Sequence, residues 1–283
     1  MSFLKLEFQT SERSRRKNWV LEVLKTQFPI AEFEGFTVKE EKVTLLLDRA
    51  LLKEKNPLSP DEIVKFLKVY FGNAFQLKQA FAKQIKVPWY FVIYQKNPEY
   101  VWVFDILEVR LIREFDNYIS FAEWTRCFRD LKMLSSYQES GLPEFDKILR
   151  WHGIPWPGNL DGIIGHPQNL EPFAIIEFQF TSKASVREHC SNKWFLPRGR
   201  RKGDEQRWKV MDIIRRQADL PLWIFVWSQN QEEGVKVKVV KDIIYSNDPQ
   251  KRRPGLVYEF KQIMSGEELL SWVSKQSEVS GST

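Results

Sequence analysis

Apolar residues recur along the chain at the two periods that are typical of strands and helices. Residues 4 to 8 alternate between apolar and polar side chains, which predicts a strand. Ser59, Pro60 and Glu62 form a helix-start signal with a capping box, and apolar residues follow at helical spacing. The remaining pattern predicts a helix around 19–24 and strands at 42–48, 89–95 and 100–108. We therefore expect an N-terminal α+β region over residues 1–134.

The second half of the chain is predicted to form one mixed sheet. The polar segment 135–141 ends in glycine and suggests a boundary, so the second region is taken as residues 135–283. Its elements follow in the order helix, strand, strand, helix, strand, which predicts a mixed sheet with helices on its faces. The predicted strands are 160–165, 173–181, 222–227 and 235–244, and the predicted helices are 143–150, 204–217 and 266–275. The fold class is therefore α/β.

Composition excludes several classes of protein. The chain has 283 residues, of which 43% are hydrophobic and 28% charged, values close to those of globular proteins. No apolar run reaches the ~18 residues that a membrane span needs, and no membrane partner is expected. Two cysteines, Cys127 and Cys190, are too few for a disulfide framework, and the N-terminus lacks a signal peptide, so we expect a cytoplasmic protein. No phosphate-binding glycine loop or dinucleotide fingerprint is present, so no nucleotide cofactor is expected.

Positive charge is concentrated in one short segment. The net charge is +6, and residues 198–209 hold six basic against two acidic side chains. Such a cluster suits the phosphates of a nucleic acid, although a solvated loop would show the same composition. The candidate DNA-binding residues are Arg198, Arg200, Arg201, Lys202, Arg207 and Lys209.

Two acidic residues occupy unusual positions in the second region. Asp161 opens one predicted strand, and Glu177 interrupts the apolar run of the next. A buried carboxylate needs a strong compensating partner, and a divalent cation shared by the two acids would supply one. Two carboxylates, the Phe178 carbonyl and waters suit Mg²⁺, which prefers oxygen ligands. Gln179 lies on the same strand face as Glu177.

This arrangement resembles the PD-(D/E)XK nuclease superfamily, which has the restriction-endonuclease-like fold. In that family an Asp near the start of one strand and an acid-x-Lys on the next bind Mg²⁺ and activate water. Asp161 and Glu177 match the two acids over a similarity that covers about residues 143–228, whereas Leu160 replaces the usual Pro and Gln179 replaces the usual Lys. Lys183 would lie on the same face if the strand continued that far. A third acid of the family comes from the preceding helix, where Glu144 and Asp146 are the candidates.

The resemblance implies a Mg²⁺-dependent endonuclease that hydrolyses double-stranded DNA, of the type II restriction class. Such an enzyme cuts both strands of a palindrome with two active sites, which implies a homodimer. The N-terminal region would then supply DNA contacts or the dimer surface. A structure-selective repair or recombination nuclease, an inactive nuclease-fold DNA-binding protein and a cytosolic scaffold remain as alternatives.

Overall fold

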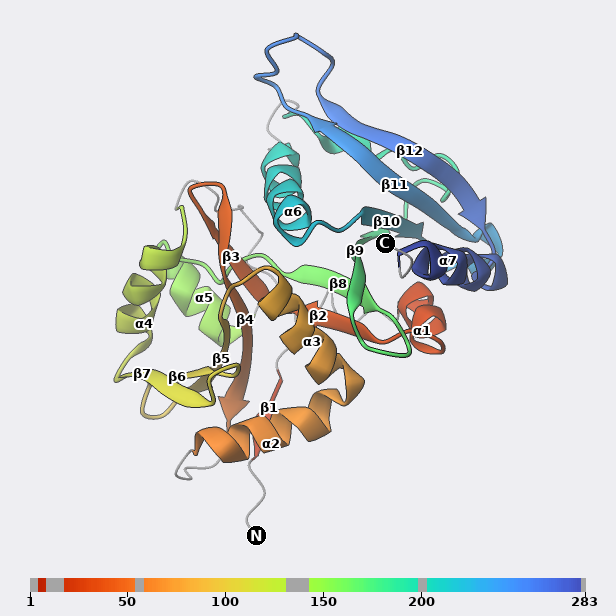
Figure 1. Cartoon of the computed structure of the whole chain (residues 1–283). Helices are drawn as coiled ribbons and strands as arrows, with labels where there is room; N and C mark the ends of the chain where they lie inside the picture. Colours follow the sequence, from red (N-terminus) through yellow and green to blue (C-terminus); the bar gives the residue numbers. More distant parts are fainter. Residues whose placement is uncertain (1–4, 9–17, 54–58, 131–142, 198–202, 281–283) are drawn as a thin grey trace. The chain divides into compact units, whose positions relative to one another are not determined.

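The computed structural model describes residues 5–8, 18–53, 59–130, 143–197 and 203–280 (Figure 1). The chain has the expected α/β class, with two mixed sheets and helices. It divides into two compact units, of which unit 1 comprises Met1–Lys17 and Glu32–Leu160, and unit 2 comprises Asn18–Ala31 and Asp161–Thr283. This division differs from the expected regions 1–134 and 135–283. The expected boundary segment, 135–141, lies outside the described residues.

Unit 1 is built on a sheet in the order β1-β4-β5-β6-β7, with β3 also paired to β4. Among the described strands of this sheet, β4 and β5 pair in parallel and the other neighbours pair antiparallel. The strands are β1 (Leu6–Glu7), β3 (Gly35–Lys39), β4 (Lys42–Leu52), β5 (Trp89–Gln95), β6 (Tyr100–Asp105) and β7 (Arg110–Phe115). The helices are α2 (Pro60–Phe71), α3 (Asn73–Gln84), α4 (Tyr118–Thr125), followed by the 3-10 turn η1 (Arg126–Phe128), and α5 (Glu144–Trp151).

Two local packing arrangements explain why the units differ from the expected regions. Helix α5 turns Phe145 and Leu149 into the core of unit 1, where Phe145 stacks on Tyr94 of β5. Helix α1 (Trp19–Lys25) instead buries Val20 and Leu24 in the core of unit 2. A helix packs on the sheet that buries its apolar face. Contacts between residues distant in sequence determine which sheet that is.

The helix start predicted at Ser59 is confirmed, but the predicted capping box is absent. Helix α2 begins at Pro60, and Ser59 occupies the N-cap position. Its side chain makes no capping hydrogen bond; the main-chain carbonyl of Ser59 accepts from the N–H of Ile63 instead. Pro60 has a φ angle that already suits a helix, and it has no N–H that needs an acceptor. The helix therefore starts here without the reciprocal side-chain bonds of a capping box.

Unit 1 also buries a network of charged side chains. Asp48 Oδ2 accepts from Lys78 Nζ at 2.6 Å and from Trp89 Nε1 at 2.8 Å, with both charged residues almost fully buried. Arg49 binds both oxygens of Asp146, and its Nε lies 3.0 Å from Glu34 Oε2. These charges are compensated by one another, as buried charges must be.

Unit 2 contains the sheet in the order β12-β11-β10-β9-β8-β2. Strands β9 and β10 pair in parallel and are connected through helix α6, which gives a strand–helix–strand crossover. The strands are β2 (Ile30–Phe33), β8 (Leu160–Gly165), β9 (Pro172–Phe180), β10 (Leu222–Trp227), β11 (Val235–Ile244) and β12 (Gly255–Met264). The helices are α1, α6 (Glu205–Ala218) and α7 (Gly266–Ser280), with 3-10 turns η3 (Ser191–Trp194) and η4 (Gln231–Glu233).

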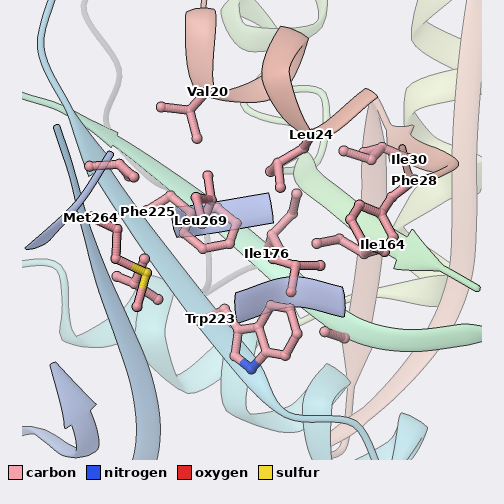
Figure 2. Close-up of a cluster of buried hydrophobic side chains, with 14 of the residues drawn as sticks. Val20, Leu24, Phe28, Ile30, Ile164, Ile176, Trp223, Phe225, Met264 and Leu269 are labelled. Atoms are coloured by element: carbon pink, nitrogen blue, oxygen red, sulfur yellow. The ribbon is translucent and has the colours of Figure 1, made fainter. Parts of the chain in front are cut away.

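The two faces of this sheet have different chemistry. On one face the strands join the side chains of α1 and α7 in a hydrophobic cluster that includes Ile176, Trp223, Phe225 and Leu269 (Figure 2). Successive strand residues point to opposite faces, so Glu177 lies on the other face, where it contacts helix α6. Strand β10 is buried along its whole length, as predicted from its apolar sequence.

A glycine allows the close approach of β8 and β9 beside the two acids. Gly162 is paired directly with Ile176. A Cβ at this position would lie 2.7 Å from Ile176 Cδ1 and 3.3 Å from Ile30 Cγ2, closer than side chains pack. A larger residue here would force the Ile176 side chain to shift, so glycine fits this position, which immediately follows Asp161 in β8.

Candidate active site

The structure places Asp161 and Glu177 opposite each other on neighbouring strands. Because Gly162 pairs with Ile176 in antiparallel register, the next pair along is Asp161 and Glu177, on one face of the sheet. Asp161 Oδ2 also accepts a hydrogen bond of 2.9 Å from the main-chain N–H of Phe178. Glu177 is 2% exposed. Two carboxylates thus share one partly buried location on unit 2.

Arg207 of α6 is the nearest cation to the acid pair that the structure describes. Its guanidinium binds Glu177 Oε1 and lies 3.9 Å from Asp161 Oδ2. Burial raises the pKa of Glu177 to about 8; Arg207 opposes this rise and the charge of Asp161 adds to it. One arginine therefore does not offset the cost of placing an ionised glutamate at this location.

One oxygen of the acid pair is left without a hydrogen bond. Glu177 Oε2 is buried and has no hydrogen-bond partner among the residues that the structure describes. A buried acceptor without a partner is uncommon in folded proteins and suggests a missing ligand. A side-chain hydrogen bond with Asp161 also contributes to the raised pKa of Glu177, so the two carboxylates are close enough to share a proton or a cation.

The main chain of Phe178 supplies a further oxygen on the same side. The N–H groups of Ile175 and Thr181 donate to Pro221 and Trp227 of the β10 side, each at 2.9 Å. Main-chain groups alternate between the two neighbours of a strand, so those of Phe178 face β8 and Asp161. Two carboxylates and a carbonyl are hard oxygen donors, and this set fits Mg²⁺. Within the described residues no group of three or more His, Cys, Asp or Glu side chains could hold a metal ion, and the acid pair itself contributes only two such side chains.

Gln179 is connected to a lysine through a serine. Its Oε1 accepts from Ser191 Oγ at 2.6 Å, and Ser191 Oγ accepts from Lys238 Nζ at 2.6 Å. Lys238, on β11, is 1% exposed. Burial, with a smaller contribution from the charges of Lys236 and Lys261, lowers the pKa of Lys238 to about 7. A lysine is therefore present near the position where the sequence has glutamine.

Lys238 and Ser191 were not among the residues predicted for the site. The signal was present in the run Val235 to Val239, where two lysines alternate with valines in a strand. Such alternation is typical of a strand with one face in water, whereas here Lys236 and Lys238 are buried and bind the segment 187–191. The partner Ser191 is distant in sequence and lies in a short 3-10 turn.

The remaining predicted catalytic residues are Lys183 and the two candidates for the third acid, Glu144 and Asp146. Strand β9 ends at Phe180, so it does not continue to Lys183, which is exposed. The two candidates for the third acid lie in unit 1, not in unit 2 with the acid pair. There Glu144 forms an ion pair with Lys96, and Asp146 forms one with Arg49.

The predicted DNA-binding residues are only partly described. Arg198, Arg200, Arg201 and Lys202 lie outside the described residues. Arg207 and Lys209 are both on α6, and Arg207 lies at the acid pair. A role of these side chains in binding DNA stays a prediction.

Comparisons with known proteins do not identify a family. No protein-family model and no curated protein sequence matches the chain. One similar solved structure is "Crystal structure of Sex pheromone staph-cAM373 precursor", with 10% identity, 90% of this chain and 84% of that chain covered, and a TM-score of 0.17. Another is "Crystal structure of carbon-nitrogen hydrolase from Helicobacter pylori G27", with 13% identity, coverage of 90% and 78%, and a TM-score of 0.14. Similarity at this level carries no argument about fold or activity.

Among the helices that the structure describes, none is both long enough and apolar enough to cross a bilayer.

Proposed function

We propose that this protein is a Mg²⁺-dependent endonuclease that hydrolyses phosphodiester bonds of double-stranded DNA, similar to type II restriction enzymes of the PD-(D/E)XK superfamily. The observation that carries the proposal is the buried Glu177 Oε2, which has no hydrogen-bond partner among the described residues and belongs to a carboxylate facing Asp161. A buried glutamate with a raised pKa beside a second acid is typical of functional sites, where a cation or a proton completes the group.

Each residue of the site has a role in this proposal. Asp161, Glu177 and the Phe178 carbonyl would hold Mg²⁺. When bound, the metal would lower the pKa of a water and stabilise the charge that develops on the phosphate. Gln179 would orient the attacking water by hydrogen bonding. Arg207 would bind a phosphate oxygen once its guanidinium has left Glu177.

The proposed substrate and assembly follow from the same chemistry. Arg198, Arg200, Arg201, Lys202 and Lys209 would bind the DNA backbone or the bases, since arginine pairs well with guanine. Cleavage of both strands of a palindrome would require a homodimer with two sites. A cytoplasmic location would suit this activity, and the two cysteines are unpaired in the structure.

A second function is favoured by one specific observation. Arg207 already binds Glu177, so an internal cation occupies part of the space that a metal would need. A nuclease fold that has lost activity and only binds DNA would show this pairing. Such a protein binds DNA without Mg²⁺ and cuts nothing.

The test is a plasmid incubation with the wild type and with Asp161→Ala. We expect discrete fragments in Mg²⁺, no cleavage in EDTA and none with Asp161→Ala, which keeps its salt-sensitive affinity for DNA. Glu259→Gln is the matched control, because Glu259 is an exposed acid on β12 and should leave cleavage unchanged. Cleavage restricted to branched or nicked DNA would indicate a structure-selective nuclease. Intact plasmid in every tube with retained DNA binding would favour the inactive DNA-binding protein.

A further inference from the structure

Three side chains from separate elements form a hydrogen-bonded chain that ends at the candidate active site. Lys238 of β11 donates to Ser191 of η3, and Ser191 donates to Gln179 of β9, with both bonds 2.6 Å long. The register across the sheet places Glu177, Ile224 and Lys238 in one row, so Lys238 shares the face of the acid pair.

The charged form of Lys238 determines the direction of every hydrogen bond in this chain. Its ammonium can only donate, so Ser191 Oγ accepts from it. The hydroxyl has a single hydrogen, which it gives to Gln179, and the amide atom that accepts it must be Oε1. The Gln179 amide is thereby fixed with Oε1 against Ser191 and with its two Nε2–H donors on the opposite side. Gln179 is only partly buried, so this end can reach a ligand.

The neighbouring lysine shows a different arrangement. Lys236 lies two residues away on the same strand face and is also buried. Its ammonium binds the main-chain carbonyls of Arg187 and His189. Lys236 therefore secures a loop, whereas Lys238 binds a side chain that leads to Gln179.

The groups around Lys238 do not neutralise its charge. Its amine lies 5.5 Å from the ring centre of Tyr258, and Lys236 and Lys261 add positive charge. The nearby His189 is held neutral, because burial and the charges of Lys238 and Lys236 lower its pKa to about 4. A buried cation in such surroundings is expensive, and an anion such as a phosphate would relieve the cost.

We propose that Lys238 is a positioning residue that acts through Ser191 to hold Gln179 as a hydrogen-bond donor toward the scissile phosphate or the attacking water. The inference rests on the proposed nuclease function. Lys238 would thereby take part of the role that a lysine at position 179 would have. Its positive charge lies two hydrogen bonds away from the Gln179 side chain. A serine beside a lysine is also a nucleophile–base pair in other enzymes, but Ser191 is 3% exposed and its hydrogen is directed to Gln179.

The first test uses two pairs of variants. Ser191→Thr and Ser191→Val have the same shape and differ only in the hydroxyl, while Lys238→Met and Lys236→Met remove neighbouring buried lysines. We expect Ser191→Val and Lys238→Met to lower kcat about tenfold to a hundredfold with little change in KM for DNA, because misplacement of a catalytic group acts on turnover. Ser191→Thr and Lys236→Met should stay close to the wild type. Equal turnover of the Thr and Val variants, or of the two Met variants, would overturn the relay.

The second test does not depend on activity. The side-chain amide signal of Gln179 is followed by ¹⁵N NMR in EDTA without DNA, and is assigned as the signal lost in Gln179→Glu. It should shift in Ser191→Val and Lys238→Met and stay in place in Ser191→Thr and Lys236→Met. If the wild type cuts no DNA, the proposed function has failed and this signal alone decides the relay. A signal that is unaffected by loss of the Ser191 hydroxyl overturns it.

Discussion

Replacement of Glu177 by glutamine should make the protein more stable at alkaline pH. Burial raises the pKa of Glu177 from 4.5 to about 8 in the folded state, although Arg207 partly offsets the effect. Below pH 4.5 the residue is protonated in both the folded and the unfolded chain. Between pH 4.5 and 8 only the unfolded chain releases the proton, so the free energy of unfolding falls as the pH rises. Above pH 8 the loss is complete.

The magnitude follows from the displacement of the pKa. At about 1.4 kcal/mol per pH unit, a rise from 4.5 to about 8 corresponds to about 5 kcal/mol. Water and relaxation around Glu177 reduce this, so we expect about 2 to 5 kcal/mol at pH 8.5. Glutamine has the same shape and carries no proton to release. Glu177→Gln should therefore match the wild type near pH 5 and exceed it increasingly up to pH 8.5.

The assay is urea unfolding of both proteins at several pH values in EDTA. The difference between the two free energies isolates Glu177 from other titrating groups, such as Glu34, whose pKa is raised to about 7 by burial. Glu259→Gln serves as the control for loss of an exposed acid. A difference that does not change with pH, or a variant that becomes less stable than the wild type as the pH rises, would refute the reasoning.

Three further predictions concern other parts of the molecule. Arg207→Ala should tighten Mg²⁺ binding in a calorimetric titration if Arg207 competes with the metal for Glu177, and weaker binding would show that Arg207 is not a competitor. Gly162→Ala should lower stability by about 1 to 3 kcal/mol in urea unfolding, because the added Cβ would meet a side chain at 2.7 Å; no loss would mean that the strands separate easily. Asp48→Asn should cost about 3 to 5 kcal/mol, since it leaves Lys78 buried without its counter-charge, and Asp48→Asn with Lys78→Met should recover much of that loss in the same measurement.

The strands of unit 2 were predictable because both faces of its sheet are covered. The residues 160–165, 222–227 and 235–244 were predicted as strands and match β8, β10 and β11. The apolar run 222–227 and the alternation of valine and lysine that opens 235–244 are both patterns typical of strands. Strand β12 was not predicted, because its outward side chains are charged and its alternation is broken where its register with β11 shifts.

Elements of unit 1 that lack a clear period were missed. Helix α3 has no proline or acidic first turn, and its N-cap is Gly72, so it continues the pattern of α2 without a start signal. Strand β7 is mostly exposed and shows little alternation. Helix α1 belongs to unit 2 and α5 to unit 1 because of their long-range packing contacts. Local sequence patterns hold no information about these contacts.

Half of the candidate site could be predicted from the sequence. The short loop between β8 and β9 makes them neighbours, and one register brings Asp161 opposite Glu177. The partners of that pair could not be predicted, because Arg207, Ser191 and Lys238 come from three other elements. The sequence indicated that Glu177 needs a compensating charge. Arg207 supplies part of that charge, but it was predicted to bind DNA.

The proposed activity is cleavage of DNA by the acid pair with Mg²⁺. The measurement that tests this most directly is the initial rate of plasmid cleavage as a function of Mg²⁺ concentration, for the wild type and for Asp161→Asn, which preserves shape and removes one charge. The account predicts a rate that rises with Mg²⁺ and saturates in the wild type and is lost in the variant, while both proteins unfold at similar urea concentrations. Cleavage by Asp161→Asn at the wild-type rate, or no cleavage by folded wild type at any Mg²⁺ concentration, would contradict it.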